Sequence, residues 1–152
     1  MINFVGNDHM SSDPNVIPFR ILVVDRDQDV REAFSLLFRV LGYDVVSLES
    51  PEEALIFVRA LQPHVIYCSL VFDGLNGFEF CRQLRKLPEA KNSLIVAISG
   101  LSFAGSQLLA NEVGFDFYYL KPGGVEIIIE TLNVFIGPLS SKTLWQKQNP
   151  EL

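Results

Sequence analysis

The side chains that could do chemistry stand where predicted strands end. Asp25 and Arg26 follow the apolar run "ILVV", and Ser69 follows "VIYC". Ser99 and Lys121 close two later apolar runs in the same way. In an open parallel α/β sheet such ends meet at one edge, where binding and catalytic sites form. A carboxylate there can hold a metal ion and a hydroxyl can act as a nucleophile, so both possibilities need testing against the sequence.

A nucleophilic serine needs a base, and Ser69 lacks one. His9 lies near the amino terminus, and His64 begins the strand that Ser69 ends. Because no nucleophile–base pair emerges, we predict no catalytic residues and no enzyme activity.

Short apolar runs alternate with helical periods along the chain. This alternation predicts an α/β fold with a doubly wound, parallel, five-stranded sheet and helices on both faces. The predicted strands are residues 21–24, 43–48, 64–69, 93–99 and 115–120. A helix follows each strand, the last over residues 125–136.

Two helices carry clear local signals. Ser50 is expected to cap a helix that has Pro51 at its first position and Glu53 at its third. In the preceding helix one apolar stripe is predicted to face the sheet, and it contains Val30, Phe34, Leu37 and Leu41.

The chain divides into three parts by pattern. Residues 1–19 show no sustained periodicity and contain two prolines, which predicts a flexible leader. Residues 20–137 form the predicted folded domain, and residues 138–152 a polar, flexible tail.

Composition narrows the class of protein. The net charge of −6 and the absence of a basic stripe argue against nucleic acid as a partner. Cys68 and Cys81 have neither zinc nor redox spacing, so we predict buried, reduced thiols. No apolar run is long enough to span a bilayer, and the amino terminus lacks signal-peptide features. These features predict a cytoplasmic protein without membrane contact.

Six segments, in order, resemble the landmarks of the response-regulator receiver domain, the CheY-like family. They are "ILVVDRDQDVREAFSLLFRVLGYDV", "SPEEAL", "PHVIYCSL", "GFEFCRQLR", "IVAISG" and "GFDFYYLKP". The resemblance covers residues 20–136. It implies a flavodoxin-like (βα)5 fold and a place in two-component signal transduction or a phosphorelay.

The family's phosphorylation site can be carried over by position. In receiver domains, two acids after the first strand and an aspartate after the third hold Mg²⁺, and that aspartate accepts a phosphoryl group from a histidine kinase. Asp25 matches the first acid, whereas Arg26 replaces the second and Ser69 replaces the acceptor. Ser99 and Lys121 match the hydroxyl and the lysine that contact the phosphoryl oxygens.

The positions that differ from the family are those that bind the metal ion and accept the phosphoryl group. Mg²⁺ prefers an octahedral set of oxygen ligands that includes carboxylates, and only Asp25 remains of the three expected. Arg26 adds a charge that it cannot lose at physiological pH. An acyl phosphate also requires a carboxylate, which Ser69 lacks. We therefore predict a degenerate pocket with no metal and no cofactor, in which Arg26 or Lys121 replaces the ion beside Asp25.

Structural roles are favoured for each of these residues. Asp25 is predicted to enter a helix or form an ion pair, with Lys121 as its partner, and Ser99 to cap a turn. Asp73 lies four residues beyond Ser69, where the family commonly has proline. We do not assign Asp73 as a displaced phosphoacceptor.

One surface is a candidate interface. By resemblance, Tyr118 is the aromatic switch residue, and Ile127 and Val134 remain outside the inward stripe of the last helix. With the turn "GLSFAG" they could form an exposed apolar patch. Receiver domains commonly dimerise or dock partners through the face of helix 4, strand 5 and helix 5. A carboxyl-terminal segment that folds over these residues is the alternative.

The combined prediction is an atypical, phosphorylation-independent receiver domain that works as a protein–protein interaction module, and it can form a homodimer. One alternative is a pseudo-receiver that senses a small molecule, as some degenerate receivers of circadian-clock kinases have been linked to cofactor sensing. A second is a conventional phospho-receiver with a displaced acceptor.

Overall fold

The structure, a computed structural model, describes residues 19–100 and 104–121. They form one sheet in the order β2-β1-β3-β4-β5, in which all neighbouring strands are parallel. The strands are β1 (Arg20–Val24), β2 (Asp44–Leu48), β3 (Val65–Cys68), β4 (Leu94–Ser99) and β5 (Phe117–Leu120). The predicted α/β fold with five parallel strands is therefore confirmed.

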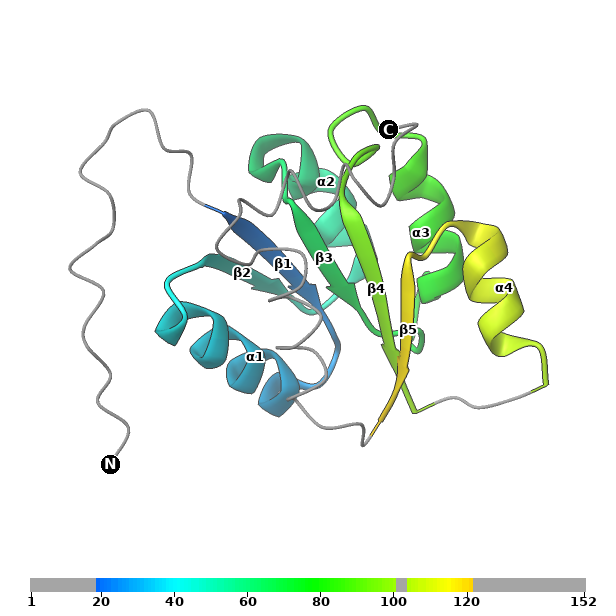
Figure 1. Cartoon of the computed structure of the whole chain (residues 1–152), viewed down its shortest axis with the longest axis horizontal. Helices are drawn as coiled ribbons and strands as arrows, with labels where there is room; N and C mark the ends of the chain where they lie inside the picture. Colours follow the sequence, from blue (N-terminus) through cyan, green and yellow to red (C-terminus); the bar gives the residue numbers. More distant parts are fainter. Residues whose placement is uncertain (1–18, 101–103, 122–152) are drawn as a thin grey trace.

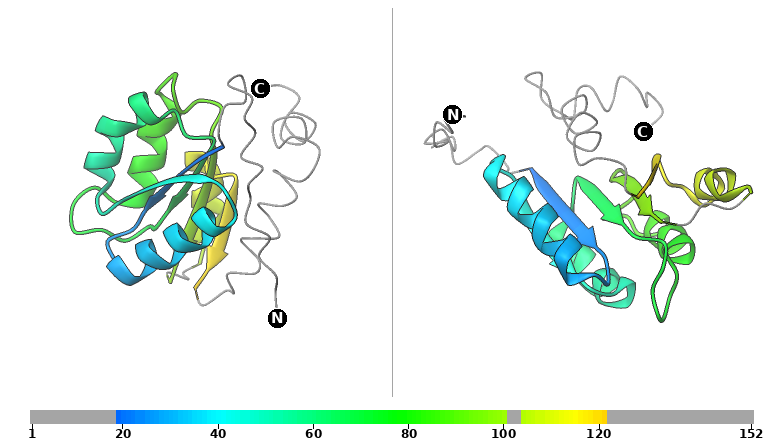
Figure 2. Two further views of the ribbon diagram at one scale, coloured as in Figure 1. Left: turned by 90° about the vertical axis from the view of Figure 1, so that its left-hand side faces the viewer. Right: turned by 90° about the horizontal axis from the view of Figure 1, so that it is seen from below.

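Four helices connect the strands within the described residues (Figure 1). They are α1 (Gln28–Val40), α2 (Pro51–Leu61), α3 (Gly77–Arg85) and α4 (Ser106–Val113). Figure 2 shows α1 on one face of the sheet and α2, α3 and α4 on the other. The predicted helix over residues 125–136, most of the leader and the tail lie outside the described residues.

The central strands are apolar because helices cover both of their faces. Alternate residues of β1 divide between two cores: Leu22 and Val24 pack with α2, α3 and α4, whereas Ile21 and Val23 pack with α1. All four side chains are at most 2% exposed. This double burial fixes the strand register, and the register in turn fixes which residues emerge at the carboxyl edge.

The inward face of α1 differs slightly from the predicted stripe. Phe34 and Phe38 are buried, and the ring of Phe38 stacks on Tyr67 with centroids 5.1 Å apart. Phe38 was not in that stripe, whereas Leu37 is only partly buried. The true centre of the face lies between Phe34 and Phe38, because these rings reach the sheet.

The residues predicted to begin α2 have their predicted roles. The Ser50 hydroxyl accepts a hydrogen bond from the Glu53 backbone N–H at 3.2 Å, and Pro51 occupies the first turn. Such a cap contributes about 1 kcal/mol to helix stability.

One residue assigned to the leader belongs to the fold instead. The carbonyl of Phe19 accepts a hydrogen bond from the Asp44 N–H at 3.0 Å. Its ring stacks on His64, with centroids 4.7 Å apart. The sheet ladder therefore extends one residue before β1. Within the described residues, no helix is long and apolar enough to cross a membrane.

Candidate functional site

The carboxyl ends of the strands bring the predicted residues to one edge of the sheet. Asp25 follows β1, Ser69 follows β3, Ser99 ends β4 and Lys121 follows β5. The Ser69 N–H donates to Val24 at 2.9 Å and the Lys121 N–H donates to Ser99 at 2.8 Å, so the ladders continue into the site. In this strand order the direction of winding changes between β1 and β3, where α/β proteins bind ligands.

Asp25 is buried, and both of its carboxylate oxygens are engaged. The side chain of Lys121 lies with Nζ 3.1 Å from Oδ2, and the Asp27 N–H donates to Oδ1 at 2.9 Å. Asp25 is 4% exposed, whereas the Lys121 side chain is 35% exposed. The predicted ion pair between Asp25 and Lys121 is confirmed.

Of the two cations predicted beside Asp25, Arg26 pairs with a different carboxylate. The Arg26 guanidinium contacts the Asp73 carboxylate at 3.3 Å, and both side chains are largely exposed. A guanidinium in water keeps its hydration, whereas moving it beside the buried Asp25 would remove that hydration. An exposed pair of this kind contributes about 0–1 kcal/mol. The cation beside Asp25 is therefore the ammonium of Lys121.

A second arginine, missed in the sequence, holds the backbone at the same place. Arg31 Nη1 donates to the carbonyls of Asp25 at 2.8 Å and Arg26 at 3.0 Å. Its position one turn into α1 was the available signal, because a helix that follows a strand directly brings its first turn over the strand end.

Ser69 has a structural role in the loop that follows β3. Its hydroxyl accepts a hydrogen bond from the Val71 N–H at 3.4 Å, and the residue is 8% exposed. His64 lies at the opposite end of β3, where its Nδ1 accepts from the Arg20 N–H at 2.9 Å. The predicted separation of this histidine from Ser69 is confirmed.

Two further residues fix the loop between β3 and α3. The Gly77 N–H donates to Leu70 at 3.1 Å, and a Cβ at Gly77 would lie 2.7 Å from the Leu70 Cα. The Glu52 carboxylate accepts from the Leu75 N–H at 2.7 Å, and this hydrogen bond lowers the pKa of Glu52. The glycines of this loop were visible in the sequence, but the link to α2 had no local signal.

Ser99, from the predicted pocket, and Tyr118, from the predicted interface, are the remaining site residues that the structure describes. Ser99 is 1% exposed. The Tyr118 hydroxyl donates to the Ser106 hydroxyl at 3.3 Å, so the ring lies toward α4. Ile127 and Val134, the other predicted interface residues, lie outside the described residues.

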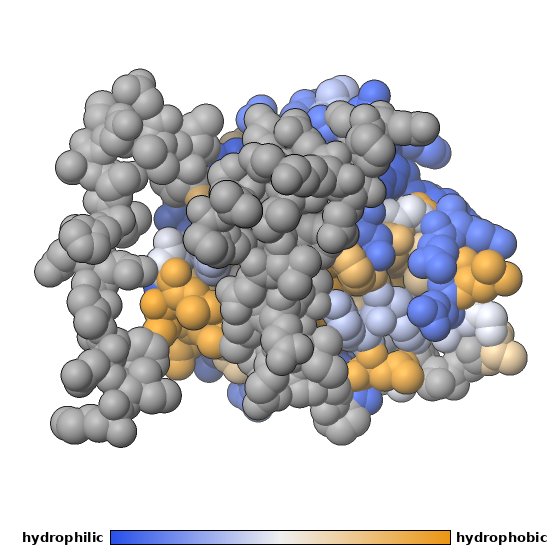
Figure 3. Space-filling model, viewed as in Figure 1, coloured by the Kyte–Doolittle hydropathy of each residue, from blue (hydrophilic) through white to orange (hydrophobic). Residues whose placement is uncertain are grey.

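The described part of the predicted interface does carry apolar surface. Leu108 of α4 is 63% exposed and Leu120 of β5 is 45% exposed. Leu36 and Val40 form a second exposed apolar stripe on α1. Figure 3 shows apolar surface over both α1 and α4.

The thiols are buried beneath the site. Cys68 Sγ donates to the Ser69 carbonyl at 2.8 Å, and burial raises the pKa of Cys68 well above its ordinary value. Burial also raises the pKa of Cys81 to about 12. Both cysteines are free and buried, as predicted.

The described residues do not fit a bound Mg²⁺. They contain no group of three or more His, Cys, Asp or Glu side chains that could hold a metal ion. Asp25 already has an ammonium at 3.1 Å, which supplies the positive charge that a metal would bring.

Comparisons with known proteins agree on the family. A model of the response regulator receiver domain matches residues 21–133. The DNA-binding response regulator MtrA of Mycolicibacterium smegmatis is 34% identical over 104 residues, which are 68% of this chain and 44% of MtrA. Protein RcaC of Microchaete diplosiphon is 31% identical over 112 residues, 73% of this chain and 17% of RcaC.

A solved structure supports the fold. The chemotaxis protein CheY4 of Vibrio cholerae superposes with a TM-score of 0.72 at 23% identity, over 77% of this chain and 98% of CheY4. The chain thus spans less than half the length of MtrA and RcaC but nearly the whole of CheY4. The matched residues contain all five strands and their carboxyl edge, and the chain belongs to the response regulator receiver domain family.

Proposed function

We propose that this receiver domain works without phosphorylation, as a protein–protein interaction module in two-component signalling. The observation that carries the proposal is the set of residues at the carboxyl edge, where Arg26 and Ser69 stand at two of the family's three acid positions. Ser69 provides a hydroxyl where an acyl phosphate needs a carboxylate, and Asp25 is neutralised by Lys121 at 3.1 Å.

The electrostatics of the edge support the same conclusion. A Mg²⁺ ion entering the site would have to displace the Lys121 ammonium from a carboxylate that is 4% exposed. It would gain a single carboxylate, the lower end of the one or two that Mg²⁺ sites normally combine with phosphate oxygens. Asp73, in the loop that follows β3, is paired with Arg26 and its side chain is 96% exposed.

In this proposal the domain passes on a signal by contact with other proteins. Leu108 and Leu120 supply exposed apolar surface on the face where we propose partner docking or homodimerisation. We place the module in the cytoplasm and assign it no reaction of its own. We also propose that this domain does not itself contact DNA, because the chain carries a net charge of −6.

The test is incubation of the full chain with a small-molecule phosphodonor and Mg²⁺, followed by intact-mass measurement. A receiver domain with an acceptor aspartate, treated in parallel, controls for the activity of the donor. We expect no mass increase for this chain. Stoichiometric, hydroxylamine-labile phosphate would contradict the proposal, and peptide mapping would then distinguish Asp25 from Asp73.

A further inference from the structure

The outer edge of β2 has backbone groups available for a further strand. Among the described residues β2 pairs only with β1. The Asp44 N–H donates to Phe19 and the Leu48 carbonyl accepts from Asp25, so residues 44, 46 and 48 bond toward β1. By the alternation of a parallel ladder, the N–H and C=O groups of Val45 and Ser47 point away from it.

This edge lacks the features that normally prevent strand addition. β2 reads "DVVSL", with no lysine, no proline and an unbroken register against β1. Its only charge is Asp44, at the start of the strand. Val46 is 36% exposed in the middle of it. Edges of this kind are suited to pairing with another strand.

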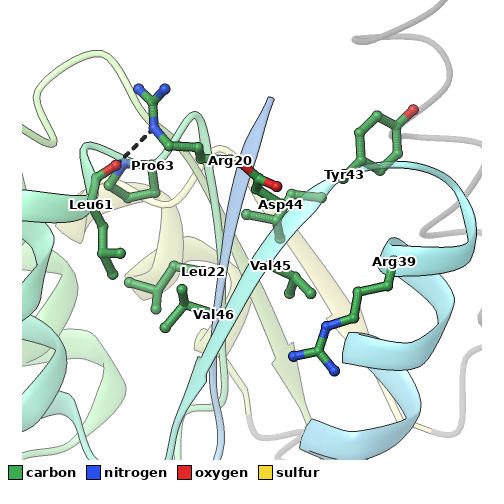
Figure 4. Close-up of a pocket in the computed structure, with 10 residues that line it drawn as sticks. Arg20, Leu22, Arg39, Tyr43, Asp44, Val45, Val46, Leu61 and Pro63 are labelled. Carbon is green, nitrogen blue, oxygen red and sulfur yellow. Dashed lines mark hydrogen bonds between the residues drawn. The ribbon is translucent and has the colours of Figure 1, made fainter. Parts of the chain in front are cut away.

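A groove with a volume of about 460 Å³ lies beside the first half of β2. Figure 4 shows Val46 beside Leu22 and Leu61 on the α2 side of β2, and Arg39 extending from α1 toward Val45 on the other side. An added strand would thus meet apolar side chains on one face and a cation on the other.

The charges beside the edge are complementary to themselves under a two-fold rotation. Arg39 lies in the last turn of α1, and Glu49 is the first residue after β2. Both are exposed, and within residues 19–100 and 104–121 neither belongs to an ion pair. Since Arg39 lines the groove near the start of β2 and Glu49 follows its end, an antiparallel copy brings opposite charges together.

We propose that two copies of this chain pair through β2, antiparallel and two-fold symmetric, to form a continuous sheet. Val45 of one copy lies opposite Ser47 of the other, and Val46 lies on the axis. Each of the two Val45–Ser47 pairs exchanges two N–H···O=C bonds, because the groups of both residues point outward. Arg39 of each copy then lies beside Glu49 of the second copy.

A parallel arrangement needs a two-fold axis along the strands, which places the α1 helices of the two copies on opposite faces of the sheet, so Arg39 of one copy would have no matching charge on its own face. An unrelated peptide would have no reason to match both charges, whereas a second copy matches them by symmetry. The inference is independent of the phosphorylation chemistry at the carboxyl edge. It also differs from the homodimer face proposed above, since β2 and β5 are opposite edges of the sheet.

The test is sedimentation equilibrium of the full chain and of charge variants. The contact is small, so we expect a dissociation constant of about 10–100 µM for the wild type. Arg39→Glu alone and Glu49→Arg alone should each be monomeric, since each places like charges together. An equimolar mixture of the two variants should restore the dimer, because both contacts again join opposite charges.

Two controls separate edge pairing from other effects. Arg59→Glu makes the same charge change in the last turn of α2, outside the groove, and should leave dimerisation unchanged. Ser47→Pro removes an outward N–H while keeping the ladder to β1, and it should abolish the dimer. Circular dichroism and melting temperature show whether each variant is folded.

Three outcomes would overturn the inference. They are a wild type that stays monomeric at about 1 mM, roughly tenfold above the upper end of the expected range, single charge variants that dimerise like the wild type, and a mixture of the two that remains monomeric. The first would fit an edge already covered by another part of the chain. The second would place the dimer contact on another face.

Discussion

The two ends of the sheet each hold a partly buried ion pair, but the pairs differ in how many hydrogen bonds support them. At the amino end, Arg85 of α3 contacts Asp116 at 2.6 Å. Arg85 also donates to the carbonyls of Gly114 and Ser93, and Asp116 accepts from the Ile95 N–H at 2.8 Å. This network ties α3, β4 and the start of β5 together.

The carboxyl end is simpler. Lys121 contacts Asp25 through one ammonium nitrogen at 3.1 Å, and its side chain is 35% exposed. The carboxylate is buried more deeply than that of Asp116, whose side chain is 21% exposed. Apart from this ammonium, the Asp25 carboxylate is supported by the Asp27 N–H, which donates to Oδ1 at 2.9 Å.

The two pairs therefore differ in the number of backbone groups that support them. Burial raises the pKa of Asp116, and the Arg85 guanidinium opposes that rise only in part. Hydrogen bonds with several backbone groups allow this pair to stabilise the fold, because they satisfy charge that would otherwise be buried without partners.

The largest effect is expected at the amino end. Arg85→Leu should lower the free energy of unfolding by about 2–4 kcal/mol, because Asp116 and three backbone carbonyls lose their donor. Urea denaturation measures it. Arg82→Leu on the same helix, whose exposed pair with Glu79 spans 3.2 Å, is the matched control and should cost less than about 1 kcal/mol. Equal losses would show that the network has no special role.

A close backbone contact beside the carboxyl edge gives the next effect. Gly77→Ala places a Cβ 2.7 Å from the Leu70 Cα and should destabilise by about 1–3 kcal/mol. Gly100→Ala is the control, because its Cβ would meet no atom within 4 Å. Thermal melting of both variants checks the prediction, and an unchanged Gly77→Ala would mean that the loop shifts easily.

The ion pair at the carboxyl edge should contribute less to the free energy of unfolding. Lys121→Met removes the cation but leaves the Asp27 N–H on Asp25, so a loss of about 1–2 kcal/mol is expected. Denaturation beside Arg85→Leu makes the comparison direct. A larger loss than for Arg85→Leu would show that the pair at the carboxyl edge contributes more to stability than the network at the amino end.

At neutral pH the ionisation of the thiols should have no effect on stability, and an effect appears only at high pH. Ionisation of Cys81 is harder in the fold, where the pKa is about 12, than in the unfolded chain, where it is about 8.5. Stability is therefore unaffected below about pH 8.5 and falls as the pH rises toward 12. A thiol reagent at neutral pH should label both cysteines only after denaturation, and rapid labelling of the native chain would contradict their burial.

The fold and part of the site could be predicted from the sequence. Strands such as β4 are wholly apolar, and their ends in a parallel sheet must meet, so Asp25 and Lys121 could be paired in advance. The direction of Arg26 could not, because it depends on Asp73 in a loop 47 residues further along the chain. The pair of Arg85 and Asp116 was also missed. The two residues are 31 positions apart, and neither stands at a strand's carboxyl end, where the search for a site began.

The most direct test of the central claim uses beryllofluoride, an analogue of the phosphoryl group that binds an acceptor carboxylate. Amide NMR spectra of the isotopically labelled full chain would be recorded before and after addition of beryllofluoride and Mg²⁺. We predict that the signals of Ser69 and Ser99 do not move, because Ser69 occupies the acceptor position and Lys121 already pairs with Asp25. Saturable shifts at these two amides would contradict a phosphorylation-independent receiver.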